Sequence, residues 1–176
     1  MDIISAWNTS NRVTAFFFEQ LPEELCDLKI PGAPNRSIRM IAGHIHNARC
    51  MWIKMIGRTY SIKAPKPVDR RNVSRQTLIR AFKASNQSMI ELLQAGIDKG
   101  GKFTIKIPWL NFPPDVMHFM SYMIAHEAHH RGQIVLVARA LGHRLPPQIT
   151  NGLWQWKQRL KEVEKMRNKK SRKKSE

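Results

Sequence analysis

The chain has 176 residues, of which 42% are hydrophobic, and its formal net charge is +17 at neutral pH. This length favours a single domain with a core of its own. No apolar run reaches the roughly 18 residues that a membrane span needs, and the first residues do not resemble a secretory signal. Two cysteines are too few for a disulfide framework, so we expect a protein of the reducing cytoplasm that does not bind membranes.

Apolar residues recur at helical spacing in five segments, which predict helices at residues 3–21, 37–57, 74–96, 113–142 and 148–166. Pro22 ends the first of them, and Ser37 and Ser74 are candidate N-caps of the second and third. Residues 58–73 are rich in proline and basic residues and predict a connector. Four substantial helices with a terminal one and almost no strand indicate an all-α bundle.

One short segment alternates in a way that is typical of a strand. It comprises residues 103–107, and because it stands alone we expect it to lie as an extended arm over the bundle. Pro113, Pro114 and Asp115 then open the fourth helix, with proline at an early helical position.

Basic residues concentrate at the C-terminus. Residues 157–176 carry ten Lys and Arg against three Glu, which gives this segment a charge of +7. Residues 169–174 include no apolar side chain and cannot bury themselves. We therefore expect a domain over residues 1–166 and a basic disordered tail over 167–176. Such a tail could contact nucleic acid nonspecifically, although the body has no recognisable nucleic-acid-binding motif.

The most informative stretch is His-Glu-Ala-His-His-Arg-Gly-Gln at residues 126–133. On a helix, His126 and His130 lie on one face about one turn apart, which suits two ligands of a single divalent metal. The stretch also matches the H-E-x-x-H pattern of zinc proteases. However, residues 131–161 contain no Asp or Glu, and the only downstream His is His143. This lack of a third ligand argues against a zinc protease.

The predicted second helix offers two candidates for the third ligand, His44 and His46. Facing helices of a bundle can bring one His and a His-x-x-x-His pair to a common point. The two candidates are about 200° apart around a helix, so both cannot face one metal, and the other would be a surface or supporting side chain. Three neutral imidazoles suit Zn²⁺, Ni²⁺ or Fe²⁺. Asn47 and Arg49, on the same helix, could face a substrate.

Other residues of the motif helix have less specific roles. Glu127 should point away from the metal, and pairing with a basic residue such as Arg131 is more plausible than catalysis. His129 could orient a ligand or serve a structural role, and His118 is a less favoured extra ligand. Arg131 and Gln133 could donate hydrogen bonds that fix the tautomers of the ligands, or could hold a helix–helix contact.

Residues 37–52, which contain His44, and the string at 126–133 resemble the DinB-like (damage-inducible protein B) family. The resemblance runs to about Gly142, and the basic tail is not part of it. It implies a DinB/YfiT-like up-down-down-up four-helix bundle, here with an additional C-terminal helix. It also implies a divalent metal held by three histidines, which by position are His44, His126 and His130.

Characterised relatives in that family include thiol S-transferases that use low-molecular-weight thiols, a maleylpyruvate isomerase and hydrolase-like proteins. The resemblance therefore implies a metal-dependent enzyme, a thiol S-transferase or a hydrolase, that acts on a small molecule and forms a homodimer. A three-His metal with an open position can lower the pKa of a bound water or thiol. Two other functions stay open: a noncatalytic metal-binding stress-response protein, and a nucleic-acid-associated bundle that uses the basic tail.

Overall fold

The computed structural model describes residues 2–105, 107 and 109–172. Its elements are α1 (Ile3–Gln20), η1 (Glu23–Leu25), β1 (Lys29–Ile30), β2 (Ala33–Ser37), α2 (Ile38–Gly57), η2 (Arg58–Tyr60), α3 (Arg75–Asp98), α4 (Val116–Ala140), α5 (Pro147–Gly152) and α6 (Trp156–Arg172). The prediction of an all-α fold is confirmed, since the only sheet in this described part is the antiparallel pair β1–β2. Within the same residues, no helix combines the length and apolarity that crossing a membrane requires.

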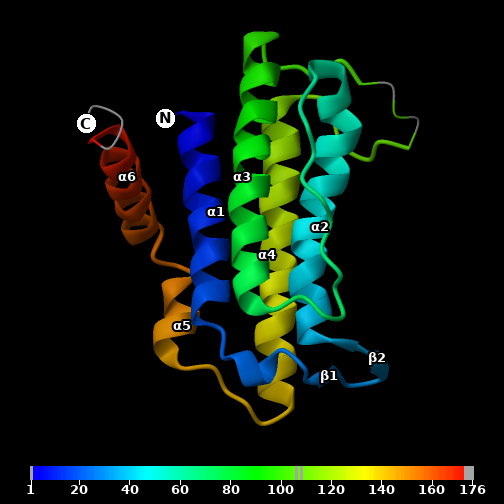
Figure 1. The fold of residues 1–176 in the computed structure, drawn as a ribbon, viewed down its shortest axis with the longest axis vertical. Coiled ribbons are helices and arrows are strands. Elements are labelled where there is room, and N and C mark those ends of the chain that lie inside the picture. Colours follow the sequence, from blue (N-terminus) through cyan, green and yellow to red (C-terminus); the bar gives the residue numbers. More distant parts are fainter. Residues whose placement is uncertain (1, 106, 108, 173–176) are drawn as a thin grey trace.

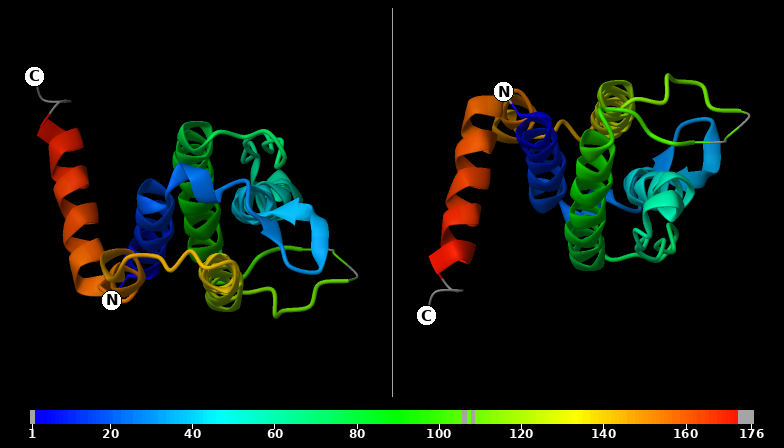
Figure 2. Two further views of the ribbon diagram at one scale, coloured as in Figure 1. Left: turned by 90° about the horizontal axis from the view of Figure 1, so that it is seen from below. Right: turned by 90° about the horizontal axis from the view of Figure 1, so that it is seen from above.

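The four long helices run up-down-down-up, as the family resemblance implies. Figure 1 shows α1 and α4 running in one direction and α2 and α3 in the other. Because α2 and α3 run the same way, the connector at residues 61–74 passes along the length of the bundle between them. α1 and α2 each pack against both α3 and α4. The end-on views in Figure 2 accordingly place α1 and α2 on opposite sides of the α3–α4 pair.

Polar side chains begin three of the long helices. Ser37, Ser74 and Asp115 each accept a hydrogen bond from the backbone N–H three residues further on, at 3.4, 3.2 and 2.9 Å. These bonds satisfy donors that have no partner inside the helix. The predicted N-caps at Ser37 and Ser74 are therefore confirmed.

The C-terminal region differs from the prediction of one helix followed by a disordered tail. Two helices, α5 and α6, replace the single one, and α6 continues to Arg172, so residues 167–172 are helical. Residues 173–176 lie outside the described residues. α6 packs along α1 outside the four-helix bundle (Figures 1 and 2). Glu162 holds it there by accepting a hydrogen bond from Arg12 Nε at 2.6 Å.

The segment at residues 103–107 forms no strand in its described positions. Lys102 and Asp115 make an isolated antiparallel bridge where the loop leaves and rejoins the bundle. Phe103 is only 5% exposed and packs into the core. The segment is thus anchored by its first residue, and Lys106 of the expected arm lies outside the described residues.

The core consists of two apolar clusters separated by a buried polar layer. One cluster lies on the side of Phe17, Phe82 and Ile134, and the other on the side of Trp7, Met89 and Phe119. At intermediate positions each long helix contributes buried polar residues, and the layer comprises Ser10, Thr14, His46, Arg49, Ser85, Glu127 and Arg131. Arg49, Glu127 and Thr14 are joined by hydrogen bonds within this layer, which offsets the cost of burying polar groups.

Candidate metal centre

α2 and α4 bring three histidines together beside the polar layer. His126 Nε2 lies 3.2 Å from Nε2 of His44 and 3.2 Å from Nε2 of His130. One nitrogen from each ring lies within 4.8 Å of the others, a grouping that could hold a metal ion. Two imidazole nitrogens on one tetrahedral Zn²⁺ are about 3.3 Å apart, given Zn–N distances of about 2.0–2.1 Å. The donor set and its spacing therefore fit a divalent metal.

Burial and neighbouring positive charge favour the neutral form of all three rings. Burial lowers the pKa of His126 to about 4, with further lowering by the charges of His130 and His44. Burial, followed by the charges of His130 and Arg70, lowers the pKa of His44. Burial also lowers the pKa of His130, although its hydrogen bond with Gln133 acts in the opposite direction. Because metal-binding imidazoles must be deprotonated, the cluster is in a binding form near neutral pH.

Side chains around the cluster set the orientation of two rings. His130 Nδ1 lies 2.7 Å from Oε1 of Gln133, and since an amide oxygen only accepts, this nitrogen carries the proton. The lone pair of His130 Nε2 then points into the cluster. Tyr122 stacks on His126, with ring centroids 6.3 Å apart. Nδ1 of His126 is buried without a hydrogen-bond partner in the described structure.

A cavity of about 390 Å³ opens beside His44 and His130. It extends away from the cluster between α2, α4, the β1–β2 pair and the connector. Its wall is formed by Ile30, Arg36, Met40, Ile41, His44, Arg70, His130, Gln133, Leu136 and Val137. The described lining thus holds two arginines and no carboxylate.

The sequence interpretation missed Arg36 and Arg70. Arg36 lies on β2 and Arg70 in the connector. Helical periodicity cannot predict which way a side chain points when its residue lies outside a helix. For Arg70 the only signal is the basic composition of residues 58–73, and Arg36 lies outside that segment. That composition could not show which of the basic side chains turns toward the histidines.

Glu127 lies on another face of α4, fully buried in the polar layer. Arg49 donates to it from Nε to Oε1 at 2.7 Å and from Nη2 to Oε2 at 2.9 Å, and Thr14 Oγ1 donates to Oε2 at 2.7 Å. The predicted structural role is confirmed, but the main partner is Arg49, because Arg131 Nη1 is 4.0 Å away. The prediction that Arg49 faces a substrate is wrong, since its side chain is 0% exposed.

The remaining histidines of interest lie outside the cluster. His46, the alternative third ligand, is fully buried and turns toward α3, where its Nδ1 lies 3.3 Å from Ser85 Oγ. The expectation of a surface position for His46 is therefore wrong. His129 is exposed on α4. His118 is also exposed and pairs with Asp115 at the start of the helix.

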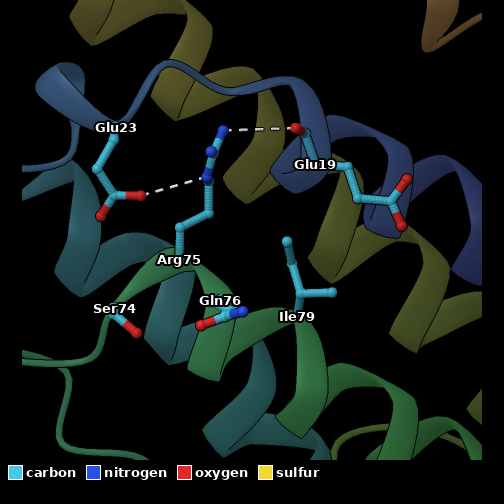
Figure 3. Close-up of a pocket in the computed structure, with 6 residues that line it drawn as sticks. All are labelled: Glu19, Glu23, Ser74, Arg75, Gln76 and Ile79. Carbon is cyan, nitrogen blue, oxygen red and sulfur yellow. Dashed lines mark hydrogen bonds and ion pairs between the residues drawn. The ribbon is translucent and has the colours of Figure 1, made fainter.

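A second hollow, of about 410 Å³, lies between the end of α1, η1 and the start of α3. Figure 3 shows Arg75 turned toward the Glu23 carboxylate and the backbone of Glu19, while the Glu19 carboxylate points away from Arg75. Arg75 Nε lies 3.2 Å from the Glu23 carboxylate, and Arg75 Nη1 donates to the backbone oxygen of Glu19 at 3.4 Å. Both lining carboxylates are thus paired, Glu23 with Arg75 and Glu19 with Arg12, and we assign no chemistry to this hollow.

The fold and the site place this protein in a class of helical bundles in which two facing helices hold a three-His cluster beside a cavity. The DinB family model matches residues 2–168, and the chain belongs to the DinB family. It is similar to a solved DinB-like protein from Bacillus cereus ATCC 10987, with 24% identity and a TM-score of 0.58. That match covers 82% of this chain and 93% of the other, and it supports the fold. The comparison with curated proteins finds no match.

Proposed function

We propose that His44, His126 and His130 bind one divalent metal ion, Zn²⁺, Ni²⁺ or Fe²⁺, and that the protein is a metal-dependent enzyme acting on a small molecule. One observation carries the proposal: three imidazole nitrogens converge, and two of these rings, those of His44 and His130, line a cavity. A purely structural site would surround its metal with protein ligands, whereas a catalytic site leaves a position open.

The reaction that we propose is transfer of a low-molecular-weight thiol, or alternatively hydrolysis. A divalent ion bound by three imidazoles lowers the pKa of a water or thiol and polarises a carbonyl group. Around it, Gln133 would hold the tautomer of His130, and the cavity beside His44 and His130 would receive the substrate. The described wall contains no carboxylate that could act as a general base, which favours a thiol over water as the nucleophile.

The test is metal analysis of the purified full chain with single and double histidine variants. We expect one equivalent of metal in the wild type and its loss in the His44→Ala/His130→Ala variant. His129→Ala is the matched control, since this exposed histidine lies one residue from His130, outside the cluster. Full metal content after removal of both His44 and His130 would refute the proposal.

A noncatalytic metal site needs a fourth protein ligand, and the described histidines near the cluster do not supply one. His46 faces α3, His118 pairs with Asp115, and His129 is exposed outside the group. An exchangeable ligand should therefore occupy the fourth position. An X-ray absorption spectrum of the metal-loaded protein that shows four protein ligands and no bound water would favour the structural alternative.

We also propose, as a second function, nonspecific binding of nucleic acid through α6. Lys157, Lys161, Lys165 and Lys169 recur every four residues along this helix and are all exposed. Side chains at that spacing form one stripe, which suits the phosphates of a nucleic-acid backbone. Deleting residues 167–176, or replacing Lys161 and Lys165 by Gln, should weaken DNA binding and reduce its dependence on salt concentration. Unchanged salt dependence in both variants would exclude this role.

A further inference from the structure

Two arginines face the cavity beside the histidine cluster, and they come from different segments. Arg36 lies on β2 and Arg70 in the connector, while His44 and His130 form the adjoining wall. We propose that Arg36 and Arg70 bind the anionic group of the substrate, a carboxylate or a phosphate, and so position the rest of the molecule at the histidines. This inference rests on the proposed function, because it takes the three-His cluster as the reaction centre.

Arg70 is held against α2 by the packing of its own backbone and stem. A Cβ atom on Gly43 would lie only 3.1 Å from Arg70 Cγ and 3.2 Å from its Cα, so glycine is what allows the connector to come this close. One turn further along α2, Asn47 donates to Val68 O at 3.0 Å and accepts from Val68 N at 2.9 Å. The connector is therefore fixed immediately before Arg70, next to His44.

Arg36 reaches the cavity from a different segment, β2. It stands on β2, one residue before the Ser37 cap, so its backbone is tied to the start of α2. Arg36 and Arg70 therefore line one cavity from two different segments, beside His44 and His130.

The rest of the wall indicates what the anion is attached to. Apolar side chains form most of it, namely Ile30, Met40, Ile41, Leu136 and Val137. Two guanidinium groups without a carboxylate in the described wall leave an uncompensated positive charge, which attracts an anion and disfavours a cationic ligand. The cavity thus fits a small molecule with one anionic group and an apolar body, within a volume of about 390 Å³.

The experiment uses three probes with the same apolar body: hexanoate, hexyl phosphate and neutral 1-hexanol. Their dissociation constants are measured by chemical-shift titration with the full-length wild type and with an Arg36→Gln/Arg70→Gln variant. Glutamine keeps the stem that packs on Gly43 while removing the charge. The primary measurements use metal-free protein, in which the probes have no metal to bind, and are then repeated with Zn²⁺.

We expect both anions to bind the metal-free wild type about tenfold more tightly than 1-hexanol, and the double variant to lose that advantage. Arg71→Gln/Arg80→Gln is the matched control, because these exposed arginines are outside the cavity lining and the charge change is equal. The anion with the larger loss identifies the headgroup. Equal binding of 1-hexanol and the anions by the wild type, or the same loss in the control variant, would overturn the inference.

Zn²⁺ content, measured in the same samples, separates this inference from the proposed function. Loss of anion binding with normal Zn²⁺ content in the double variant supports both. Normal Zn²⁺ content with unchanged anion binding refutes the anion site alone. If the wild type binds no Zn²⁺ while the double variant still loses anion binding, the metal proposal fails and the arginines remain an anion site.

Discussion

Replacing Glu127 by Gln should destabilise the protein by about 3 kcal/mol while leaving its metal content unchanged. The carboxylate and the Arg49 guanidinium are both 0% exposed and are joined by two short hydrogen bonds. Removing one partner of a buried ion pair costs about 3–5 kcal/mol, because the other charge stays buried without compensation. Asn11, which accepts from Arg49 Nη1 at 2.9 Å, keeps part of that compensation, so we expect the lower end of the range.

Urea unfolding followed by circular dichroism measures this loss. With a slope of about 2 kcal/mol per molar urea, the midpoint should fall by about 1.5 M. The control is a double-mutant cycle with Arg49→Met, in which the double variant should lose less stability than the two single variants together. A loss below about 1 kcal/mol, or additive losses in the cycle, would refute the reasoning. Loss of metal without loss of stability would instead give Glu127 a role at the metal.

Glu127→Gln should also change how the stability of the protein depends on pH in acid. Burial alone raises the pKa of the Glu127 carboxyl, but the charge and hydrogen bonds of Arg49 outweigh it, so the pKa lies below its ordinary value of 4.5. The unfolded chain therefore takes up this proton first as the pH falls. The contribution of the carboxylate is full above about pH 4.5 and is lost below it. Wild-type stability should thus fall more steeply below that pH than the stability of Glu127→Gln.

Two further substitutions test the surroundings of the site and the docking of α6. Gln133→Ala removes the acceptor that holds the Nδ1 proton of His130, and it should weaken Zn²⁺ binding about tenfold in a competition assay with a chelator. Unchanged affinity would exclude that role. Glu162→Gln weakens the contact with Arg12 and should increase hydrogen exchange of the α6 amides severalfold, while leaving the four-helix bundle protected. Glu164→Gln, an exposed change on the same helix, should have no such effect.

The helices could be predicted from the sequence because their signals are local. Apolar spacing and N-cap residues such as Ser37 and Ser74 depend on a few neighbouring positions, and the structure places caps at both. The pair His126 and His130 could be expected to lie together because residues four apart have a fixed geometry on a helix. The choice of His44 over His46 depends on family resemblance, and the structure groups His44 with the pair while His46 turns toward α3. Metal binding by the three histidines stays a proposal.

The polar layer could not be predicted, because its pairings join residues far apart in the chain. Arg49 and Glu127 are 78 residues apart, and neither has a sequence neighbour that identifies the other. The spacing of one helical turn predicts an ion pair between Glu127 and Arg131. In the structure the tertiary contact with Arg49 overrides this local rule. The same reason applies to the C-terminal end of α6. This helix packs on α1, a contact between distant parts of the chain, and it continues into residues that carry few apolar side chains.

The proposed metal ligands and the cavity arginines stand on different kinds of backbone. His44, His126 and His130 belong to long helices whose other faces pack in the core, whereas Arg36 and Arg70 belong to a short strand and an irregular connector. Segments outside helices accept substitutions and changes of length far more readily than packed helices do. Ligand selectivity in this bundle can therefore diverge without disturbing the histidines. An engineer who wishes to redirect it would randomise residues 33–36 and 66–71 and leave the helices alone.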